Sequence, residues 1–164
     1  MSSTYLSNDV FKLVVDNTPL ISLDLVVRNA SGQILLGERV NRPAQGYWFV
    51  PGGRIRKNET IADAFMRLTL DELGVALPIS SARYLGLFEH FYSDSVFGNT
   101  PSTHYVVNAF EISIDSNLTD LPNQQHSGYL WWGESQLLDS KKVHVHSKWY
   151  FLKDNGIECS KGSA

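Results

Sequence analysis

Apolar residues recur at every second position in several short segments, which is the pattern of half-buried β-strands. In the segment 21–29 the alternating aliphatic residues are Ile21, Leu23, Leu25 and Val27. Similar runs predict strands at 33–39, 47–50, 83–92, 104–113 and 129–132. Ser31-Gly32 is a turn signal, so the first two strands form a predicted hairpin. Several strands follow one another without an intervening helix, which is typical of an α+β domain.

Helical periodicity is clearest from Thr60 to Leu73. Thr60 followed by Asp63 resembles a capping box, and Gly74 is placed for a left-handed C-terminal cap. A short amphipathic piece around 10–15 and a last helix at 146–153 complete the predicted elements, with polar loops at 93–103 and 116–128. We therefore expect a mixed β-sheet packed between a few helices.

The chain of 164 residues has the length of one domain, which we expect to span 1–153 with a loose tail at 154–164. Its net charge of −3 argues against a nucleic-acid partner held by its phosphates. The single cysteine, Cys159, excludes an intrachain disulfide and a thiolate zinc site. No apolar run has the length of a membrane span, so we expect a cytoplasmic protein without a membrane partner.

Charge is unevenly distributed in the middle of the chain. Between positions 39 and 57 all five charged residues are basic: Arg39, Arg42, Arg54, Arg56 and Lys57. The segment that follows carries the acids Glu59, Asp63, Asp71 and Glu72. A basic loop beside an acidic helix suits a metal–diphosphate complex, because arginine binds phosphate oxygens and carboxylates bind a hard divalent cation. The alternative is a solvated loop and a solvated helix face.

Glu72 is unusual within the helix at 60–73. The apolar residues Ile61, Ala64, Phe65 and Leu68 fall on one face, and at 100° per residue Glu72 projects into the middle of that face. A carboxylate in a core position costs several kcal/mol unless it is paired or bound to a metal. Glu72 is therefore the predicted functional carboxylate, whereas Asp71 is expected to pair with Arg67 along the helix.

These residues form a recognisable motif. Gly53, Glu59, Arg67, the acid pair Asp71-Glu72 and Gly74 have the spacing of the Nudix box, and the stretch 53–75 resembles this loop–helix–loop signature of Mg²⁺-dependent hydrolases. The resemblance implies the Nudix fold, an α/β/α sandwich. The sequence departs from the box at Leu68, which stands where the family has a glutamate that helps to hold the metal cluster. It also departs at the first acid of the pair, which is Asp71 instead of glutamate, and at Thr69, where the family usually has an aliphatic residue.

Other segments are similar to one branch of this family, the GDP-mannose mannosyl hydrolases. They are the stretch 41–54, the strand 103–107 and the pair Gln125-His126, within a resemblance that extends from about Asn17 to Leu152. Members of the branch share the altered box and cut the sugar–oxygen bond. The resemblance implies a homodimer that hydrolyses GDP-mannose, and also GDP-glucose, to GDP and free hexose with inversion at C1.

The resemblance also implies a role for each site residue. The metal, Mg²⁺ with Mn²⁺ as a possible substitute, would be held by the Gly52 carbonyl, Glu72 and Gln125. His126, on the predicted loop beside Gln125, would be the general base. The remaining implied residues contact the substrate: Arg39, Arg54 and Tyr105 the diphosphate, and Asp24 and His90 the sugar.

Two other functions stay open. A Nudix diphosphatase would attack phosphorus and release a nucleoside monophosphate and a sugar 1-phosphate. A non-catalytic domain would only bind a nucleotide sugar, a possibility that Leu68 favours. Among single residues, Tyr105 is explained equally well as a core ring and as a ligand contact, whereas Phe49 is expected in the core, with stacking on guanine as the alternative. His144 and His146 alternate as if on one strand face and could form a metal pair, but with no third ligand nearby we expect a structural or surface role.

Overall fold

The computed structural model describes residues 5–115 and 126–152, with only the backbone described at 126 and 127. In these residues the strands are β1 (Leu20–Arg28), β2 (Ile34–Arg39), β3 (Trp48–Phe49), β4 (Gly52–Arg54), β5 (Ala82–Tyr92), β6 (Thr103–Ser113) and β7 (His126–Trp132). The helices are α1 (Asn8–Asn17), α2 (Ile61–Leu73), α3 (Glu134–Asp139) and α4 (Val145–Lys148), with 3₁₀ turns η1 (Ile79–Ser81) and η2 (Trp149–Phe151).

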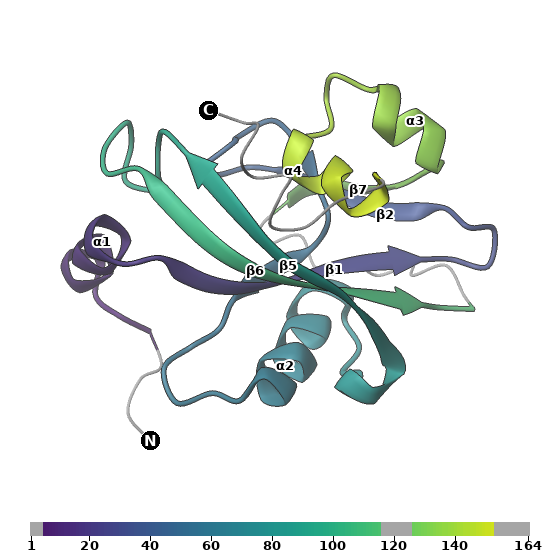
Figure 1. Ribbon diagram of the computed structural model, residues 1–164, viewed down its shortest axis with the longest axis horizontal. Helices are drawn as coiled ribbons and strands as arrows, with labels where there is room; N and C mark the ends of the chain where they lie inside the picture. The colour runs from purple at the N-terminus through teal and green to yellow at the C-terminus, as the bar shows by residue number, and fades with distance from the viewer. Residues whose placement is uncertain (1–4, 116–125, 153–164) are drawn as a thin grey trace.

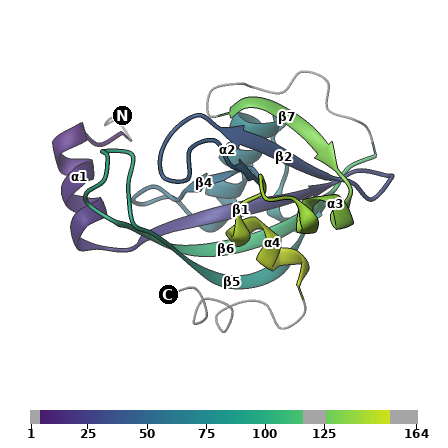
Figure 2. The same ribbon diagram turned by 90° about the horizontal axis from the view of Figure 1, so that it is seen from above.

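The described strands form one mixed sheet. Its order is β3-β2-β1-β6-β5, with β4 added to β1 and β7 added to β2. β1 and β6 run parallel, whereas the other strand pairs are antiparallel. Figure 1 shows α2 on one side of this sheet and α3 with α4 on the other, and Figure 2 shows α1 at one end of the strands. The α+β prediction and the sheet between helices are confirmed.

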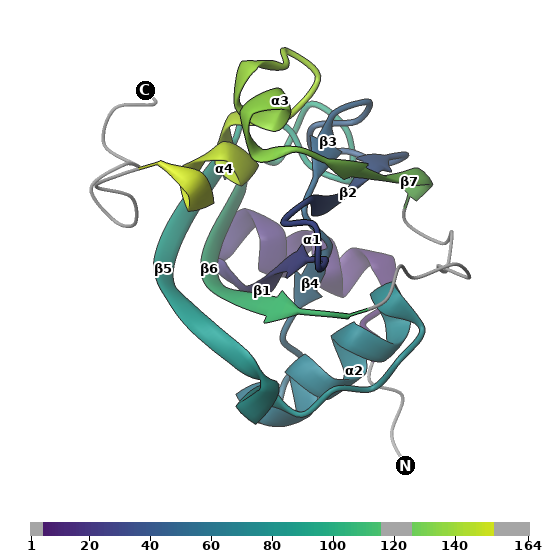
Figure 3. The ribbon, with the colours of Figure 1, turned by 90° about the vertical axis from the view of Figure 1, so that its right-hand side faces the viewer.

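The central strand β1 serves both faces of the sheet because successive side chains point to opposite sides. Leu23, Leu25 and Val27 pack in the core that lies under α2. Val26 packs in the second core, with α3 and η2. Asp24 lies two residues before Val26 and therefore faces the second side, away from α2. Figure 3 shows the two layers on either side of the sheet.

Helix α2 begins and ends as its sequence predicts. The Thr60 hydroxyl accepts a hydrogen bond from the Asp63 backbone N–H at 3.1 Å and donates one to the Asp63 carboxylate at 2.7 Å. Gly74 has φ 77°, the left-handed conformation that closes the helix. These caps fix where the helix starts relative to the loop before it.

Several predicted boundaries were wrong. The helix near the N-terminus is longer than 10–15, α3 was not predicted, and the last helix is the short α4 followed by η2 instead of a helix at 146–153. His144 and His146 do not share a strand face, because His144 is the N-cap of α4 and its Nδ1 accepts from the His146 backbone N–H at 3.2 Å. The tail at 154–164, with Cys159, lies outside the described residues.

Two corrections concern the site directly. The sequence predicted that strand 47–50 ends at Pro51-Gly52-Gly53, but Gly52–Arg54 is a strand of its own that pairs with β1. β7 starts at His126, three residues earlier than predicted, so the backbone of His126 lies in a strand and pairs with Arg39 instead of lying in a loop. Both differences arise because pairing with a distant strand overrides a weak local β signal.

Candidate functional site

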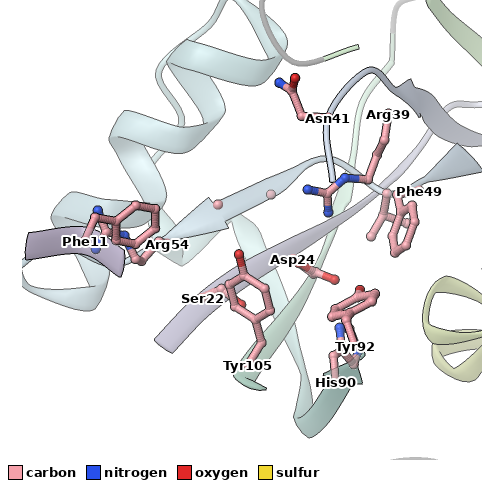
Figure 4. Close-up of a pocket in the computed structure, with 13 residues that line it drawn as sticks. Phe11, Ser22, Asp24, Arg39, Asn41, Phe49, Arg54, His90, Tyr92 and Tyr105 are labelled. Carbon is pink, nitrogen blue, oxygen red and sulfur yellow. The ribbon is translucent and has the colours of Figure 1, made fainter. Parts of the chain in front are cut away.

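A pocket of about 340 Å³ opens where the ends of β1, β2, β4, β5 and β6 meet under α1. It contains six of the nine residues predicted for the site: Asp24, Arg39, Gly52, Arg54, His90 and Tyr105. In Figure 4, Asp24, His90 and Tyr92 gather at one end, Arg54 lies with Phe11 at the other, and Tyr105 lies between. The strand register agrees, because Gly52 pairs with Asp24 and Arg54 pairs with Ser22.

Two guanidinium groups supply the positive charge of the pocket. Arg54 lies 4.3 Å from the centre of the Phe11 ring, and Arg39 lies 5.3 Å from the centre of the Phe49 ring. In the part of the chain that the structure describes, neither arginine forms a salt bridge with a carboxylate. Arginines held against rings in this way present their N–H groups to an anionic ligand.

The electrostatic environment of Arg54 and Tyr105 supports the same conclusion. Burial lowers the pKa of Arg54, and the cations Arg56 and Arg67 lower it further. Burial raises the pKa of Tyr105, against the influence of Arg39 and Arg54. Tyr105 therefore lies in the pocket as a neutral hydroxyl that can donate to an anion, although the sequence left a core position equally open.

Asp24 is the acidic residue at the end of the pocket opposite Arg54. Its Oδ2 accepts a hydrogen bond from the Tyr150 hydroxyl at 2.5 Å, and the same hydroxyl lies 3.3 Å from His90 Nε2. Burial raises the pKa of Asp24 to about 6, although Tyr150 and the charge of Arg39 lower it. A carboxylate and hydroxyls gathered around a small space suit the hydroxyl groups of a polar ligand.

A cluster of three histidines, His90, His144 and His146, packs behind this end of the pocket. The rings of His90 and His146 stack at 4.2 Å, and those of His144 and His146 lie 4.6 Å apart. Burial, and then the neighbouring histidines, lower the pKa of His90 well below its ordinary value. The three imidazoles are therefore neutral near pH 7. His90 also lines the pocket, and a structural role for His144 and His146 stays a prediction.

Glu72 lies on the other side of the sheet from this cluster. Its side chain is buried, with 2% of its surface exposed, on the apolar face of α2 as the periodicity predicted. Tyr129 of β7 donates a hydrogen bond to Glu72 Oε2 at 3.4 Å, and burial and Glu72 raise the pKa of Tyr129. Glu72 does not line the pocket itself.

An ion pair ties α2 to the loop before it. Arg67 Nε donates to Glu59 at 2.6 Å, and Arg67 also donates to the backbone carbonyl of Arg54 at 3.0 Å. The predicted Arg67–Asp71 pair is present at 3.6 Å, but Glu59 is the closer partner. Glu59 and Arg67, two charged residues of the box, thus hold the Arg54 backbone in place.

Leu68 fills the space next to the glycine pair. A Cβ added at Gly53 would lie 2.5 Å from Leu68 Cδ2, so the leucine packs directly on the Gly53 backbone. At Gly52 an added Cβ would lie 2.7 Å from Asp24 Oδ1 and 2.4 Å from the Leu23 carbonyl oxygen. Glycine is required at position 52, where an added Cβ would meet the Leu23 backbone, whereas at position 53 the end of the Leu68 side chain would have to move.

Two residues that line the pocket, and one that contacts its lining, were not predicted. Phe11 comes from α1, Tyr92 from the end of β5 and Tyr150 from η2. Aromatic residues in short amphipathic segments are also typical of a core, so nothing in the sequence distinguished them. Gln125 lies outside the described residues, and of His126 only the backbone is described.

The residues present fit a divalent cation. Glu72 is a buried carboxylate, and the glycine pair lets a carbonyl approach a ligand closely; both are oxygen donors of the kind that Mg²⁺ binds. Among the side chains described, no three His, Cys, Asp or Glu converge as a complete ligand set. Any site formed by the described residues therefore has few carboxylates. No helix in residues 5–115 and 126–152 is long and apolar enough to cross a membrane.

This sheet between helices, with a loop–helix segment tied together by Glu59 and Arg67, is the fold of the Nudix hydrolases. Residues 18–153 match the model of the NUDIX domain family. The chain belongs to the Nudix family. Nudix hydrolases generally use divalent metal ions such as Mg²⁺ or Mn²⁺.

Known proteins agree with this assignment. The chain is 46% identical over 125 residues to the low-salt glycan biosynthesis protein Agl8 of Haloferax volcanii. The aligned residues make up 76% of this chain and 78% of that protein. A MutT protein from Methanosarcina mazei superposes with a TM-score of 0.67 at 18% identity, over 82% of this chain and 92% of that one. The NUDIX domain of Shewanella oneidensis NrtR, solved with ADP ribose, gives 0.62 at 18% identity, over 89% and 97%.

Proposed function

We propose that this protein hydrolyses a GDP-hexose, GDP-mannose or GDP-glucose, to GDP and free hexose. Water would attack C1 of the sugar with inversion, with Mg²⁺ bound and Mn²⁺ as a possible substitute. The observation that carries the proposal is the packing of Leu68 on Gly53, because an apolar side chain occupies the position of the family's metal-binding glutamate.

Attack at phosphorus in this family relies on a cluster of metal ions, which that glutamate helps to hold. Attack at the anomeric carbon makes a smaller demand, since its main requirement is to stabilise the charge that develops on the departing diphosphate. A single carboxylate such as Glu72, two arginines and a neutral tyrosine match this smaller requirement. The pocket is lined by Arg39, Arg54 and Tyr105, whereas Glu72 lies outside its lining.

The roles of the pocket residues follow from their chemistry. Arg39 and Arg54, which form no salt bridge with any carboxylate of the described residues, would bind the diphosphate oxygens, and Tyr105 would donate a hydrogen bond to them. Asp24 and His90 would contact the sugar at the opposite end. Gly52, Glu72 and Gln125 would hold the metal, which supplies further neutralisation of charge on the leaving GDP.

His126 is the proposed general base. Its backbone pairs with Arg39 across β2 and β7, at the strand end that opens into the pocket. An imidazole titrates near neutral pH and can accept the proton of the attacking water. The name of the Haloferax volcanii relative, a glycan biosynthesis protein, agrees with a substrate that carries a sugar.

The test is a panel of nucleotide sugars incubated with Mg²⁺, in which the nucleotide products are identified by chromatography. The proposal predicts GDP and free hexose from GDP-mannose. GMP together with mannose 1-phosphate would establish the phosphorus-attacking diphosphatase instead. Tight binding of the nucleotide sugars without any product would establish a non-catalytic binding domain.

Replacing the base gives a second test. We expect His126→Gln to lower turnover of GDP-mannose by about 10²–10⁴-fold while Mg²⁺ binding is nearly retained, as for the loss of a general base. Steady-state kinetics and a titration with Mn²⁺ followed by electron paramagnetic resonance measure the two effects separately. Near-unchanged turnover would remove His126 from the mechanism.

A further inference from the structure

The Tyr150 hydroxyl is a polar group at the base of the pocket that does not line it. Tyr150 of η2 is 6% exposed and belongs to the core that includes α3. Its ring packs edge-on against Phe88 at 4.7 Å. A phenylalanine would fill this core equally well, so only the contacts of the hydroxyl explain a tyrosine at this position.

The hydroxyl contacts two groups of the proposed sugar end. It lies 2.5 Å from Asp24 Oδ2 and 3.3 Å from His90 Nε2. A tyrosine hydroxyl has one hydrogen, and a carboxylate can only accept. Tyr150 therefore donates its hydrogen to Asp24, and the hydrogen between Tyr150 and His90 must come from the imidazole. The resulting chain runs from His90 Nε2–H to the Tyr150 oxygen, and from the Tyr150 O–H to Asp24.

His90 is well placed to keep this tautomer. Its ring stacks on His146 at 4.2 Å with an interplanar angle of 12°, and Trp149 lies edge-on to it at 5.8 Å. These contacts fix the plane of the imidazole, and its Nε2 lies 3.3 Å from the Tyr150 hydroxyl.

The two hydrogen bonds act on the orientation of one carboxylate. Asp24 Oδ2 is held by Tyr150, whereas Oδ1 lies on the side of Gly52, where an added Cβ would be 2.7 Å away. Both Asp24 and Gly52 line the pocket. A carboxylate anchored through one oxygen presents the other in a fixed direction, which is how a supporting shell pre-organises a binding group.

We propose that Tyr150 is a positioning residue that orients the Asp24 carboxylate toward the hexose of the substrate. The inference rests on the proposed function for the identity of the ligand, but the orientation of Asp24 is a property of the protein alone. The positioning role predicts that Tyr150→Phe, which removes one oxygen atom from a buried ring, reduces recognition of the sugar and leaves recognition of GDP intact.

The test is a double-mutant cycle of Tyr150→Phe and Asp24→Ala. We expect Tyr150→Phe to lower kcat/KM for consumption of GDP-mannose by about 10- to 100-fold, the usual effect of losing a hydrogen bond to a charged group. The Kd for GDP with Mg²⁺ should change much less than kcat/KM does, because GDP lacks the hexose that Asp24 is proposed to contact. In the Asp24→Ala background, Tyr150→Phe should have no further effect, since its effect passes through the carboxylate.

The matched control is Tyr84→Phe. Tyr84 also lies on the sheet, and its hydroxyl donates to Asn108 at 3.1 Å on the exposed surface; kcat/KM should not change. Additive losses in the double variant, or an equal weakening of GDP binding, would reduce Tyr150 to a structural residue and overturn the proposal. Unchanged kcat/KM in Tyr150→Phe would do the same.

A crystal structure of ligand-free Tyr150→Phe separates this proposal from the proposed function, because it requires no substrate. We expect the Asp24 carboxylate to rotate or to occupy two conformers while the backbone of β1 stays in place. An unchanged, single orientation of Asp24 would contradict the positioning role. If the wild-type protein does not consume GDP-mannose, the proposed function fails, and the crystal structure still decides whether Tyr150 orients Asp24.

Discussion

The two faces of the sheet build the site in different ways. On the α2 face the contacts are local, since Arg67 binds Glu59 eight residues away and Leu68 packs on Gly53. On the α4 face the contacts span the chain, since Tyr150 reaches Asp24 across 126 residues of sequence. Local contacts leave a spacing pattern that can be recognised, whereas distant contacts leave none. The α2 face therefore carries the motif by which the family can be recognised, whereas the contacts of the α4 face are visible only in the folded protein.

The largest effect should follow removal of the buried carboxylate on the α2 face. We expect Glu72→Gln to lower turnover more than about 100-fold, because a proposed metal ligand matters at least as much as the groups that support one. The matched control is Asp71→Asn, whose carboxylate is 50% exposed and lies 3.6 Å from Arg67. Steady-state rates at saturating Mg²⁺ should change less than about twofold in the control. Equal losses in both variants would contradict the assignment.

Leu68→Glu tests whether the leucine reflects a loss of catalysis or a change from attack at phosphorus to attack at the sugar carbon. We expect no GMP from GDP-mannose, since a restored glutamate lacks the other ligands of a metal cluster. The variant should also lose about 2–4 kcal/mol of unfolding free energy, because a carboxylate would be placed on the buried surface next to Gly53. Urea denaturation and product analysis measure the two outcomes.

The control for this variant is Leu70→Glu. Leu70 is exposed on α2, and its substitution should change the unfolding free energy by no more than about 0.5 kcal/mol. Substantial GMP from Leu68→Glu would show that the remaining residues already support attack at phosphorus. The contrast between the two faces would then not explain the proposed chemistry.

A smaller effect should follow loss of the ion pair between α2 and its loop. Arg67→Ala removes two hydrogen bonds to Glu59 and one to the Arg54 carbonyl, and we expect a loss of about 2–3 kcal/mol in unfolding free energy. The control, Arg83→Ala, breaks a pair with Glu111 in which Arg83 is 70% exposed, and it should cost less than about 1 kcal/mol. Similar losses in both variants, measured by denaturant unfolding, would show that Arg67 is an ordinary surface cation.

The smallest predicted effect is a pH dependence of stability that differs between the two faces of the sheet. Burial, and then the charge of Arg39, lowers the pKa of His144 to about 4. Burial, and then the neighbouring His144, lowers the pKa of His146 to about 3. The unfolded chain therefore binds more protons below pH 6.5, and stability falls as the pH falls through that value toward 4 and 3. Between pH 7 and 5 we expect a loss of about 1–2 kcal/mol for each histidine.

On the α2 face the window is more acidic. The hydrogen bond from Arg67 lowers the pKa of Glu59 below its ordinary value of 4.5, so the stability that this pair contributes is lost only as the pH falls below 4.5. His146→Phe should flatten the stability profile between pH 7 and 5 and leave the lower window unchanged. An unchanged profile in that variant, measured by thermal unfolding at each pH, would contradict a neutral buried imidazole.

The sequence predicted the parts of the fold that depend on local signals. The caps Thr60 and Gly74 and the buried Glu72 were correct because each follows from spacing along one element. The strand β1 was also correct, but its burial does not alternate as predicted, since Ile21 is exposed and Val26 is buried. The short strand β4 and the start of β7 were missed because their pairing partners, in β1 and β2, are far away in sequence.

The pocket shows the same limit at the level of single residues. Asp24, Arg39, Arg54 and His90 were expected there from the family resemblance, and the structure brings them together. Tyr150 was not expected, since a tyrosine between Trp149 and Phe151 gives no sign of a partner near the start of the chain. Its role follows only from the fold, which packs η2 beneath β1.

The central claim is that water attacks the sugar carbon and not phosphorus. The most direct test is hydrolysis of GDP-mannose with Mg²⁺ in H₂¹⁸O, with mass spectrometry of both products and NMR of the first anomer formed. The account predicts ¹⁸O at C1 of mannose, unlabelled GDP and inverted configuration at C1. Incorporation of ¹⁸O into GMP or mannose 1-phosphate would contradict it.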